Sequence, residues 1–205
     1  ILTMPSTGTY ATAFYGCTGL ETVALPDGLT EIAARAFSGC SKLASVRLPS
    51  TLTSIGEYAF YDCKALADVV VPEKITTLSR SLFAGCTGLK SVTIPAGVKT
   101  IDSGTFNKCS ALESIELPEG LTTLGSQAFM NCSALKSVRI PDGVTAIPNE
   151  TFAYCSVLET VELPSALKTI GNMGFYKNNA LRSISFPETL ETIGTNSFDE
   201  CHSLA

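Results

Sequence analysis

The chain has 205 residues, of which 45% are hydrophobic and 16% are charged, so it can bury a continuous core and does not have the composition of a disordered tail. Its formal net charge of -5 argues against a nucleic-acid partner, because nucleic-acid-binding proteins usually carry a basic stripe. No apolar run approaches the length of a membrane span, and no charged and apolar leader opens the sequence, so we expect no membrane insertion of this segment.

The sequence is one short unit repeated at a step of 23 residues. A step of about 20 to 50 residues indicates a solenoid, which offers an extended face instead of the deep pocket of a globular enzyme. Residues 1–19 form a degenerate first unit, in which the segment from Pro5 to Phe14 is two residues shorter than its equivalents. Regular repeats follow over residues 20–203, and the chain stops at Ala205 within a repeat. We therefore expect residues 1–205 to be a single solenoid domain cut from a longer protein.

Each regular unit begins with a short strand. Val46 and Leu48 alternate with Ser45 and Arg47, and this period of two, rich in β-branched residues, predicts a strand with one buried face. Pro49 then ends the strand, because proline has no amide proton to donate to a neighbouring strand. A turn follows, and four of the units carry Pro-Asp-Gly, Pro-Glu-Gly or Pro-Ala-Gly at this place.

The rest of the unit is a threonine-rich stretch and a tight bend. Residues Thr53 to Ile55 predict a second short strand. The stretch from there to Cys63 is too short for more than a helical turn or a 3₁₀ piece, with Phe60 packed inward. One such unit cannot offset the entropy of ordering its own backbone, so consecutive units must stack at one strand spacing, about 4.8 Å. The predicted fold is mainly β with short 3₁₀ or helical turns, a parallel-strand solenoid of about nine units of 23 residues.

These residues resemble the BspA-like, or Treponema-type, leucine-rich repeat family. The resemblance covers almost the whole chain, from about Phe14 to Leu204, and departs from the family pattern at Asn178, Gly174 and Pro148. It implies a right-handed, parallel-stranded leucine-rich-repeat solenoid, found in secreted or cell-surface proteins of bacteria and some protozoa, often as adhesins. One unit carries the family pattern in full: Leu112, Ile115, Leu117, Pro118, Leu121, Leu124, Gly125, Ala128, Phe129 and Cys132.

The cysteines keep the repeat step, with Asn178 in one of their places. Stacked equivalents would lie about 5 Å apart at Cα, within disulfide range, yet seven in an unbroken row cannot all pair. No C-x-x-C spacing suggests zinc. Cysteine and asparagine are both compact and can donate to a backbone carbonyl, which favours a structural ladder over disulfides or a metal. The ladder consists of Cys17, Cys40, Cys63, Cys86, Cys109, Cys132, Cys155, Asn178 and Cys201.

The outward positions of the first strand carry two rows of charged residues, whose signs alternate from Lys90 onward. Opposite charges on adjacent strands attract, so the rows can fix the register of the stack and keep an exposed sheet in solution. The same rows can instead form a polar docking face for a partner. The candidate ligand-binding residues are Arg47, Lys90, Glu113, Glu116, Lys136, Arg139, Glu159, Glu162 and Arg182.

The same rows are poor candidates for catalysis. Glu116 and Glu162 would lie near 9.6 Å apart, just beyond the usual separation of about 6.5 to 9.5 Å in an inverting glycosidase. Arg139 between them favours ionised carboxylates, which is the wrong direction for a general acid. The only histidine, His202, lies in the incomplete last unit. We expect no catalytic residue and no enzyme activity.

Two weaker patterns lie elsewhere in the unit. Acidic residues recur beside the prolines, but single carboxylates in only some units fall short of a calcium site, so we expect neither metal nor cofactor. Tyr15, Tyr61 and Tyr176 share the position after the phenylalanine, where an exposed ring would suit a protein or glycan contact and a half-buried ring would serve packing.

Three functions are compatible with this sequence. The first is a non-enzymatic adhesion module of a secreted or cell-surface protein, which binds a protein or glycoprotein ligand of a host or neighbouring cell through the exposed sheet. The second is a structural spacer or stalk, and the third is an enzyme of the parallel β-helix type. The residues at position 22 and its equivalents are almost all small hydroxyls, which favours a spacer, whereas the varied row of Arg47, Val70, Thr93 and Glu116 favours a binder. We expect the binding module; the sequence names neither the ligand nor the oligomeric state.

Overall fold

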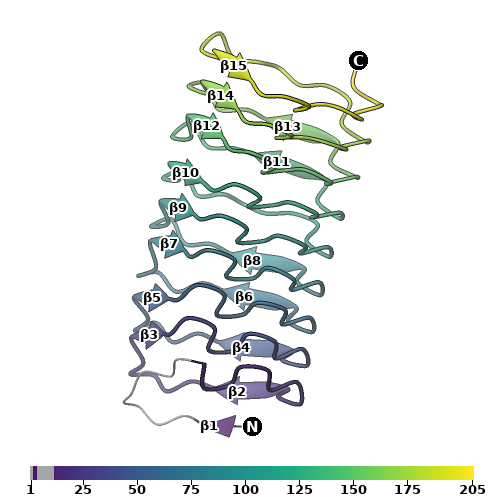
Figure 1. Cartoon of the computed structure of the whole chain (residues 1–205). Helices are drawn as coiled ribbons and strands as arrows, with labels where there is room; N and C mark the ends of the chain where they lie inside the picture. Colours follow the sequence, from purple (N-terminus) through teal and green to yellow (C-terminus); the bar gives the residue numbers. More distant parts are fainter. Residues whose placement is uncertain (1, 4–11) are drawn as a thin grey trace.

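The computed structural model describes residues 2–3 and 12–205 as one stack of coils, with the two chain ends at opposite ends of the stack (Figure 1). Parallel strands join residues one repeat apart, so that Val23 pairs with Val46 and Val69 with Val92. The described residues form strands and turns but no helix. The predicted parallel-strand solenoid is therefore confirmed. The described residues contain no helix that is long and apolar enough to cross a membrane.

The first strand of each coil belongs to one column of parallel strands. In each three-residue strand the central valine is buried and its two neighbours are exposed, as the period of two predicts. The column is not assigned as strand at Ser114–Glu116, and at Ser183 it is reduced to a single bridge with Thr160. The strands are β1 (Leu2–Thr3), β2 (Thr22–Ala24), β4 (Ser45–Arg47), β6 (Asp68–Val70), β8 (Ser91–Thr93), β11 (Ser137–Arg139) and β13 (Thr160–Glu162).

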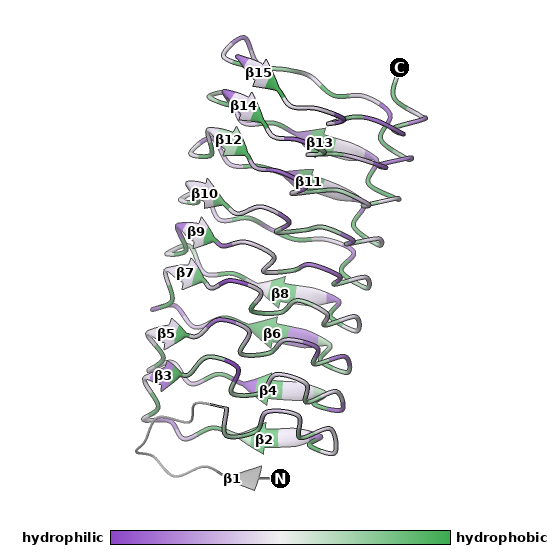
Figure 2. Ribbon diagram, in the orientation of Figure 1, coloured by the Kyte–Doolittle hydropathy of each residue, from purple (hydrophilic) through white to green (hydrophobic). Residues whose placement is uncertain are grey.

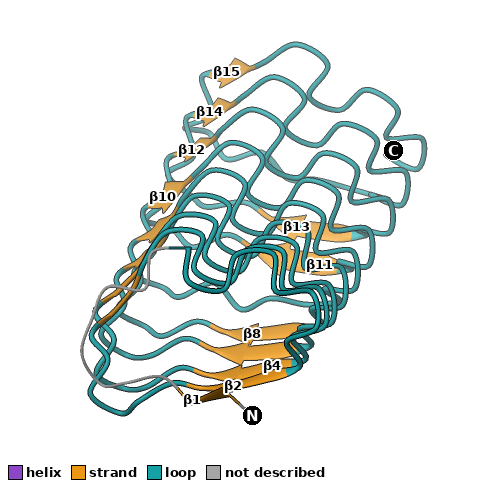
Figure 3. Ribbon diagram, turned by 60° about the horizontal axis from the view of Figure 1, so that its bottom comes forward, coloured by secondary structure: helices purple, strands orange, loops and turns teal. Residues whose placement is uncertain are grey.

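The second strand of each coil belongs to another column, which forms a different side of the stack (Figure 3). Each strand has two residues, and its second residue is an isoleucine or leucine that faces the core in every strand but the last. Figure 2 shows the apolar ends of these strands repeating along the stack. The strands are β3 (Glu31–Ile32), β5 (Ser54–Ile55), β7 (Thr77–Leu78), β9 (Thr100–Ile101), β10 (Thr123–Leu124), β12 (Ala146–Ile147), β14 (Thr169–Ile170) and β15 (Thr192–Ile193).

In the first unit the paired strand residues are separated by fewer residues than in the next unit. Leu2 of β1 pairs with Val23 of β2, whereas Val23 pairs with Val46, so the first step is two residues shorter than the next. The degenerate first unit stays a prediction, because the sequence places its shortening in one segment. Most of that segment, from Pro5 to Phe14, lies outside the described residues.

The bend after the second strand is a series of turns, where the sequence suggested a helical or 3₁₀ piece. The amide of Ser38 donates to the carbonyl of Arg35 in its own coil at 3.1 Å, whereas the amide of Phe37 donates to the carbonyl of Ala59 in the next coil at 2.8 Å. Two residues that flank the phenylalanine take positive φ, 60° at Arg35 and 78° at Gly39. A left-handed residue cannot continue a right-handed helix, so the bend bonds to its neighbours instead.

A stack of phenylalanine rings runs through the core. The rings from Phe14 to Phe198 contact one another in eight successive pairs, with centroids 5.3–5.8 Å apart and planes within 15° of parallel. The seven rings from Phe37 to Phe175 are fully buried. Each coil therefore completes the core of its neighbours, which is why the unit needs stacking to fold.

Candidate functional site

The cysteine thiols form hydrogen bonds along the stack. Cys63 donates from Sγ to the carbonyl of Phe37 in the preceding coil at 3.2 Å, and Cys86 donates to the carbonyl of Phe60 at 3.0 Å. The bond recurs at every cysteine from Cys40 onward. All eight cysteines are free. This arrangement gives the thiols a structural role between coils.

Asn178 occupies the cysteine place with a different bond. Its Oδ1 accepts a hydrogen bond from the backbone amide of Cys155 at 3.0 Å. Its Nδ2 is buried and has no partner among the described residues. The sequence suggested that asparagine would donate to a carbonyl in place of the thiol. The side chain instead accepts, and leaves a buried donor whose desolvation costs about 1–3 kcal/mol.

Burial makes most of these thiols unreactive. Desolvation raises the pKa of Cys155 from 9.0 to about 12, and it is also the main cause that raises the pKa of Cys40 to about 12. Because the thiolate is the reactive species, neutral buried thiols are poor nucleophiles. Cys17 is exposed and Cys201 half-buried, so these two ends of the ladder are the accessible thiols. Within residues 12–205 no cluster of three His, Cys, Asp or Glu is arranged to hold a metal ion.

The exposed residues of the first strand column, which we call the sheet face, hold the nine candidate ligand-binding residues. In the carboxyl-terminal part these residues pair with one another across coils. Lys136 lies 3.0 Å from Glu113, and Arg182 lies 3.3 Å from Glu159. All four side chains are largely exposed, so each pair adds little stability by itself.

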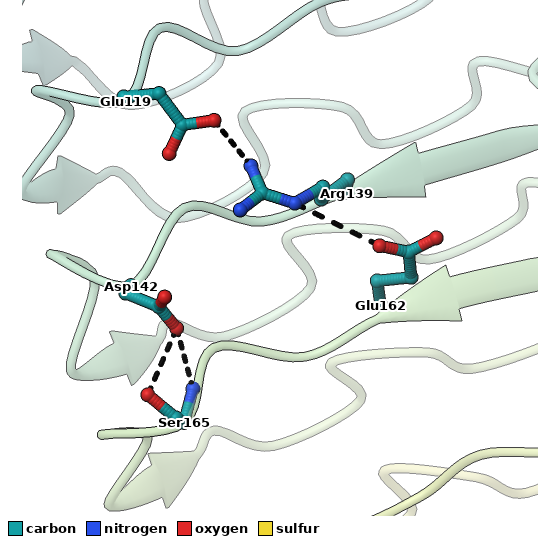
Figure 4. Close-up of polar contacts among 5 residues, drawn as sticks. All are labelled: Glu119, Arg139, Asp142, Glu162 and Ser165. Carbon is teal, nitrogen blue, oxygen red and sulfur yellow. Dashed lines mark hydrogen bonds and ion pairs between the residues drawn. The ribbon is translucent and has the colours of Figure 1, made fainter.

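Arg139 links three successive coils (Figure 4). Its Nη1 donates to Glu119 of the preceding coil at 2.5 Å, and its Nε lies 3.7 Å from Glu162 of the next coil. The hydrogen bond and charge of Glu119 raise the pKa of the Arg139 guanidinium. The partner on the preceding coil is thus Glu119 of the proline turn and not Glu116, which the alignment of rows had placed beside Arg139.

A second polar contact joins two proline turns in the same region. The carboxylate of Asp142 accepts hydrogen bonds from the amide of Ser165 at 2.8 Å and from its hydroxyl at 2.9 Å (Figure 4). These bonds lower the pKa of Asp142 below its ordinary value of 3.8. Here an acidic residue beside a proline therefore joins two neighbouring coils by hydrogen bonds. Sequence reasoning considered these residues only as calcium ligands and did not predict this role.

The amino-terminal part of the sheet face is built differently. Arg47, Lys90 and Glu116 form no ion pair with a described residue. Between β4 and β6 the surface forms an open groove of about 520 Å³. Val70 lines it with its side chain 67% exposed. The groove is lined by Val46, Arg47, Leu48, Ser50, Asp68, Val70, Val71, Pro72 and Glu73.

Sequence reasoning placed Arg47 in this region but did not find the groove. Val70 was noted only as part of a varied row, although a valine at an outward strand position beside small Ala67 is a signal of an exposed apolar spot. At this place β4 is the last strand of one sheet and β6 the first strand of another, a break that a repeat alignment cannot show. Of the nine candidates, the structure joins six in ion pairs and leaves Arg47, Lys90 and Glu116 unpaired within the described residues.

Three comparisons relate the chain to known proteins. A family model described as "BspA type Leucine rich repeat region (6 copies)" matches residues 7–132 and 79–205. A leucine rich repeat protein of Treponema pallidum is 27% identical over 99% of this chain and 77% of its own, with a TM-score of 0.57. A leucine rich cell surface protein of Faecalibacterium prausnitzii is 23% identical over 95% of this chain and 74% of its own, with a TM-score of 0.58. No curated protein sequence matches significantly.

Proposed function

The chain belongs to the BspA-type leucine-rich repeat family, and on that premise we propose that it is a non-enzymatic binding module of a secreted or cell-surface protein. Its ligand is a protein or glycoprotein of a host or neighbouring cell. The ligand docks on the amino-terminal part of the sheet face, over the groove between β4 and β6. The description of the Faecalibacterium prausnitzii protein as a cell surface protein supports the location.

The observation that carries this proposal is Val70 in its groove. An apolar side chain that is 67% exposed gains free energy when a partner covers it, at about 25 cal/mol for each Å² of apolar surface removed from water. The groove also holds an unpaired guanidinium at Arg47 and carboxylates at Asp68 and Glu73. An apolar centre with charged residues around it is the usual composition of a protein recognition site.

The carboxyl-terminal part of the sheet face supports a narrower role. There Glu113, Lys136, Glu159 and Arg182 are joined in pairs between coils, so a partner that used them would have to break these pairs. This pattern favours the spacer function for residues 113–205. The binding surface that we propose therefore keeps three of the nine candidates, Arg47, Lys90 and Glu116, beside the groove carboxylates Asp68 and Glu73.

The experiment is a binding assay with matched variants. The whole chain is immobilised and tested against a panel of purified extracellular glycoproteins and against intact cells. Val70→Glu and Arg47→Glu place or reverse a charge in the groove, and we expect each to weaken the strongest interaction at least about tenfold, as hot-spot changes do. Val157→Glu changes a valine that is also exposed but lies outside the sheet face, and it serves as the control.

Two results would contradict the proposal. If no glycoprotein or cell binds the chain above background, the spacer function stands alone. If binding occurs and Val157→Glu weakens it as much as Val70→Glu, the groove is not the docking site. Circular dichroism of each variant separates loss of binding from loss of fold.

A further inference from the structure

A second hollow lies on the turn side of the stack, away from the sheet face. It has a volume of about 360 Å³ and spans three successive coils. Tyr61 comes from one end of the hollow, Ala84 and Gly85 from the middle coil, and Asn107 and Lys108 from the other end. The hollow is lined by Tyr61, Asp62, Lys64, Ala84, Gly85, Thr87, Asn107 and Lys108.

The hollow exists because the middle coil carries small residues. At the two turn positions after the phenylalanine this coil has Ala84 and Gly85, where the coils beside it have large polar side chains. Gly85 takes φ +77° and lies against the carboxylate of Asp62, so that a Cβ at this position would overlap the carboxylate. Both the backbone conformation and the contact favour glycine here. The gap between Tyr61 and Lys108 therefore arises from the small residues of the middle coil.

The wall at Tyr61 is held in place. The ring of Tyr58 meets the ring of Tyr61 edge to face, with centroids 5.9 Å apart, and the guanidinium of Arg35 lies 4.9 Å from the centroid of Tyr58. Tyr61 itself remains 38% exposed. A braced and partly open aromatic ring is a surface on which the C–H face of a sugar ring can lie.

The other walls supply hydrogen-bonding groups with no partners of their own. Lys64 and Lys108 form no ion pair with a described residue. The Oδ1 of Asn107 is buried without a hydrogen-bond donor among the described residues, so this atom faces away from any ligand in the hollow. Asp62 accepts hydrogen bonds and Thr87 both donates and accepts.

The same turn positions near the carboxyl terminus are occupied by contacts within the protein. Tyr154 and Tyr176 pack edge to face, with centroids 5.4 Å apart, and the ammonium of Lys177 lies 5.8 and 5.3 Å from their ring centroids. Lys177 also lies 3.4 Å from Glu200. In that part adjacent coils satisfy the aromatic and cationic groups, whereas at Tyr61 and Lys108 the small middle coil keeps such groups apart.

We propose that this hollow binds a terminal sugar that carries a carboxylate. The sugar ring lies on Tyr61, its carboxylate faces Lys64 and Lys108, and its hydroxyls meet Asp62 and Thr87. The volume is near the lower end of small-ligand pockets, about 300 to 1,000 Å³, so it suits one sugar unit. Two lysines against one carboxylate favour an acidic sugar over a neutral one, because the pocket carries one excess positive charge.

The test is a titration of the whole chain, followed by NMR or calorimetry, with glucuronic acid, N-acetylneuraminic acid, glucose and inorganic phosphate. For an open site of this size we expect at least one acidic sugar to bind with a Kd on the order of 1 mM, and glucose and phosphate to bind at least about tenfold more weakly. The two acidic sugars separate a uronic acid from a sialic acid. Equal binding of phosphate would reduce the hollow to a general anion site and overturn the proposal.

Variants locate the site. Thr87→Trp fills the hollow from an exposed position, and Tyr61→Ala removes the aromatic ring on which the sugar lies. Both variants should abolish binding. Tyr61→Phe keeps the ring and should keep binding. Tyr176→Ala is the matched control on the same row of turns, and it should leave the Kd unchanged. Val70→Glu on the sheet face should also leave it unchanged, so failure of this proposal and failure of the protein-binding proposal are distinguishable. Absence of saturable binding, or binding that survives Thr87→Trp, would refute the inference.

Discussion

The two parts of the stack share the same repeat but differ in how many of their charged side chains form ion pairs. Residues 1–112 carry nine Lys and Arg and eight Asp and Glu, and none of those nine cations forms an ion pair with a described residue. Residues 113–205 carry five Lys and Arg and eleven Asp and Glu, and all five cations are paired across coils. The cations of the second part therefore join neighbouring coils, whereas those of the first part form no such pairs with described residues.

The turn side repeats this contrast. Lys177 contacts two tyrosine rings and Glu200 in adjacent coils, whereas Lys108 is separated from Tyr61 by a coil with Ala84 and Gly85. Both hollows that we connect with binding, the sheet-face groove at Val70 and the turn-side hollow at Tyr61, lie in the first part. A repeat fold can thus vary its surface from one part to the next while the core stays uniform.

The largest expected effect tests whether the core is in fact uniform. Phe60 lies in the first part and Phe152 in the second, and both are fully buried with stacked rings on both sides. Phe60→Ala and Phe152→Ala should each lower the free energy of unfolding by about 3–5 kcal/mol, because each removes a buried ring and leaves a cavity. Denaturant unfolding measures both. A clear difference between the two losses would mean that the two parts differ inside as well as outside.

Alkaline pH should act on the core of both parts. A buried thiol whose pKa is raised in the folded state stabilises the fold below its unfolded pKa and loses that contribution as pH rises toward the folded pKa. For Cys155 that window runs from pH 9.0 to about 12. We expect the free energy of unfolding to fall there by about 1.4 kcal/mol per pH unit for each such thiol. The slope should be smaller in Cys155→Ala, and an unchanged slope would argue against a buried neutral thiol.

Asn178 is the place where the core of the second part departs from the pattern. Asn178→Cys should raise the free energy of unfolding by about 1–2 kcal/mol, because it removes a buried amide donor without a partner and restores the thiol bond to a carbonyl. Cys86→Asn makes the opposite change in the first part and should destabilise. If Asn178→Cys lowers stability instead, the Oδ1 bond to the amide of Cys155 outweighs the unpaired Nδ2.

The constant step from one coil to the next explains which contacts could be predicted from the sequence. Phe37 over Phe60, Cys40 over Cys63 and Val23 beside Val46 follow from a fixed step and one strand spacing, since equal residues at equal places must stack. The positive φ at Arg35 and Tyr58 could not be predicted, because a long side chain gives no signal of a left-handed residue. The bend was therefore expected to be helical.

Side-chain reach explains what the sequence missed at the surface. The rows placed Arg139 beside Glu116, but its guanidinium extends along the coil to Glu119 in the proline turn. Both hollows arise from differences between neighbouring coils, such as Gly85 beside Asp62, which an alignment of repeats averages away. The pattern of the repeat predicts the scaffold, and the departures from it build the candidate sites.

The most direct measurement of the difference between the two parts is the salt dependence of unfolding in one matched pair of variants. Arg139→Gln removes a cation that bridges Glu119 and Glu162, and Arg47→Gln removes a cation with no such partner. We expect Arg139→Gln to lower the denaturant midpoint at low salt and the loss to disappear near 1 M salt, where the screening length is about 3 Å. We expect no such loss for Arg47→Gln. Equal, equally salt-sensitive losses in both variants would show that the charges of the two parts do not differ in their contribution to stability.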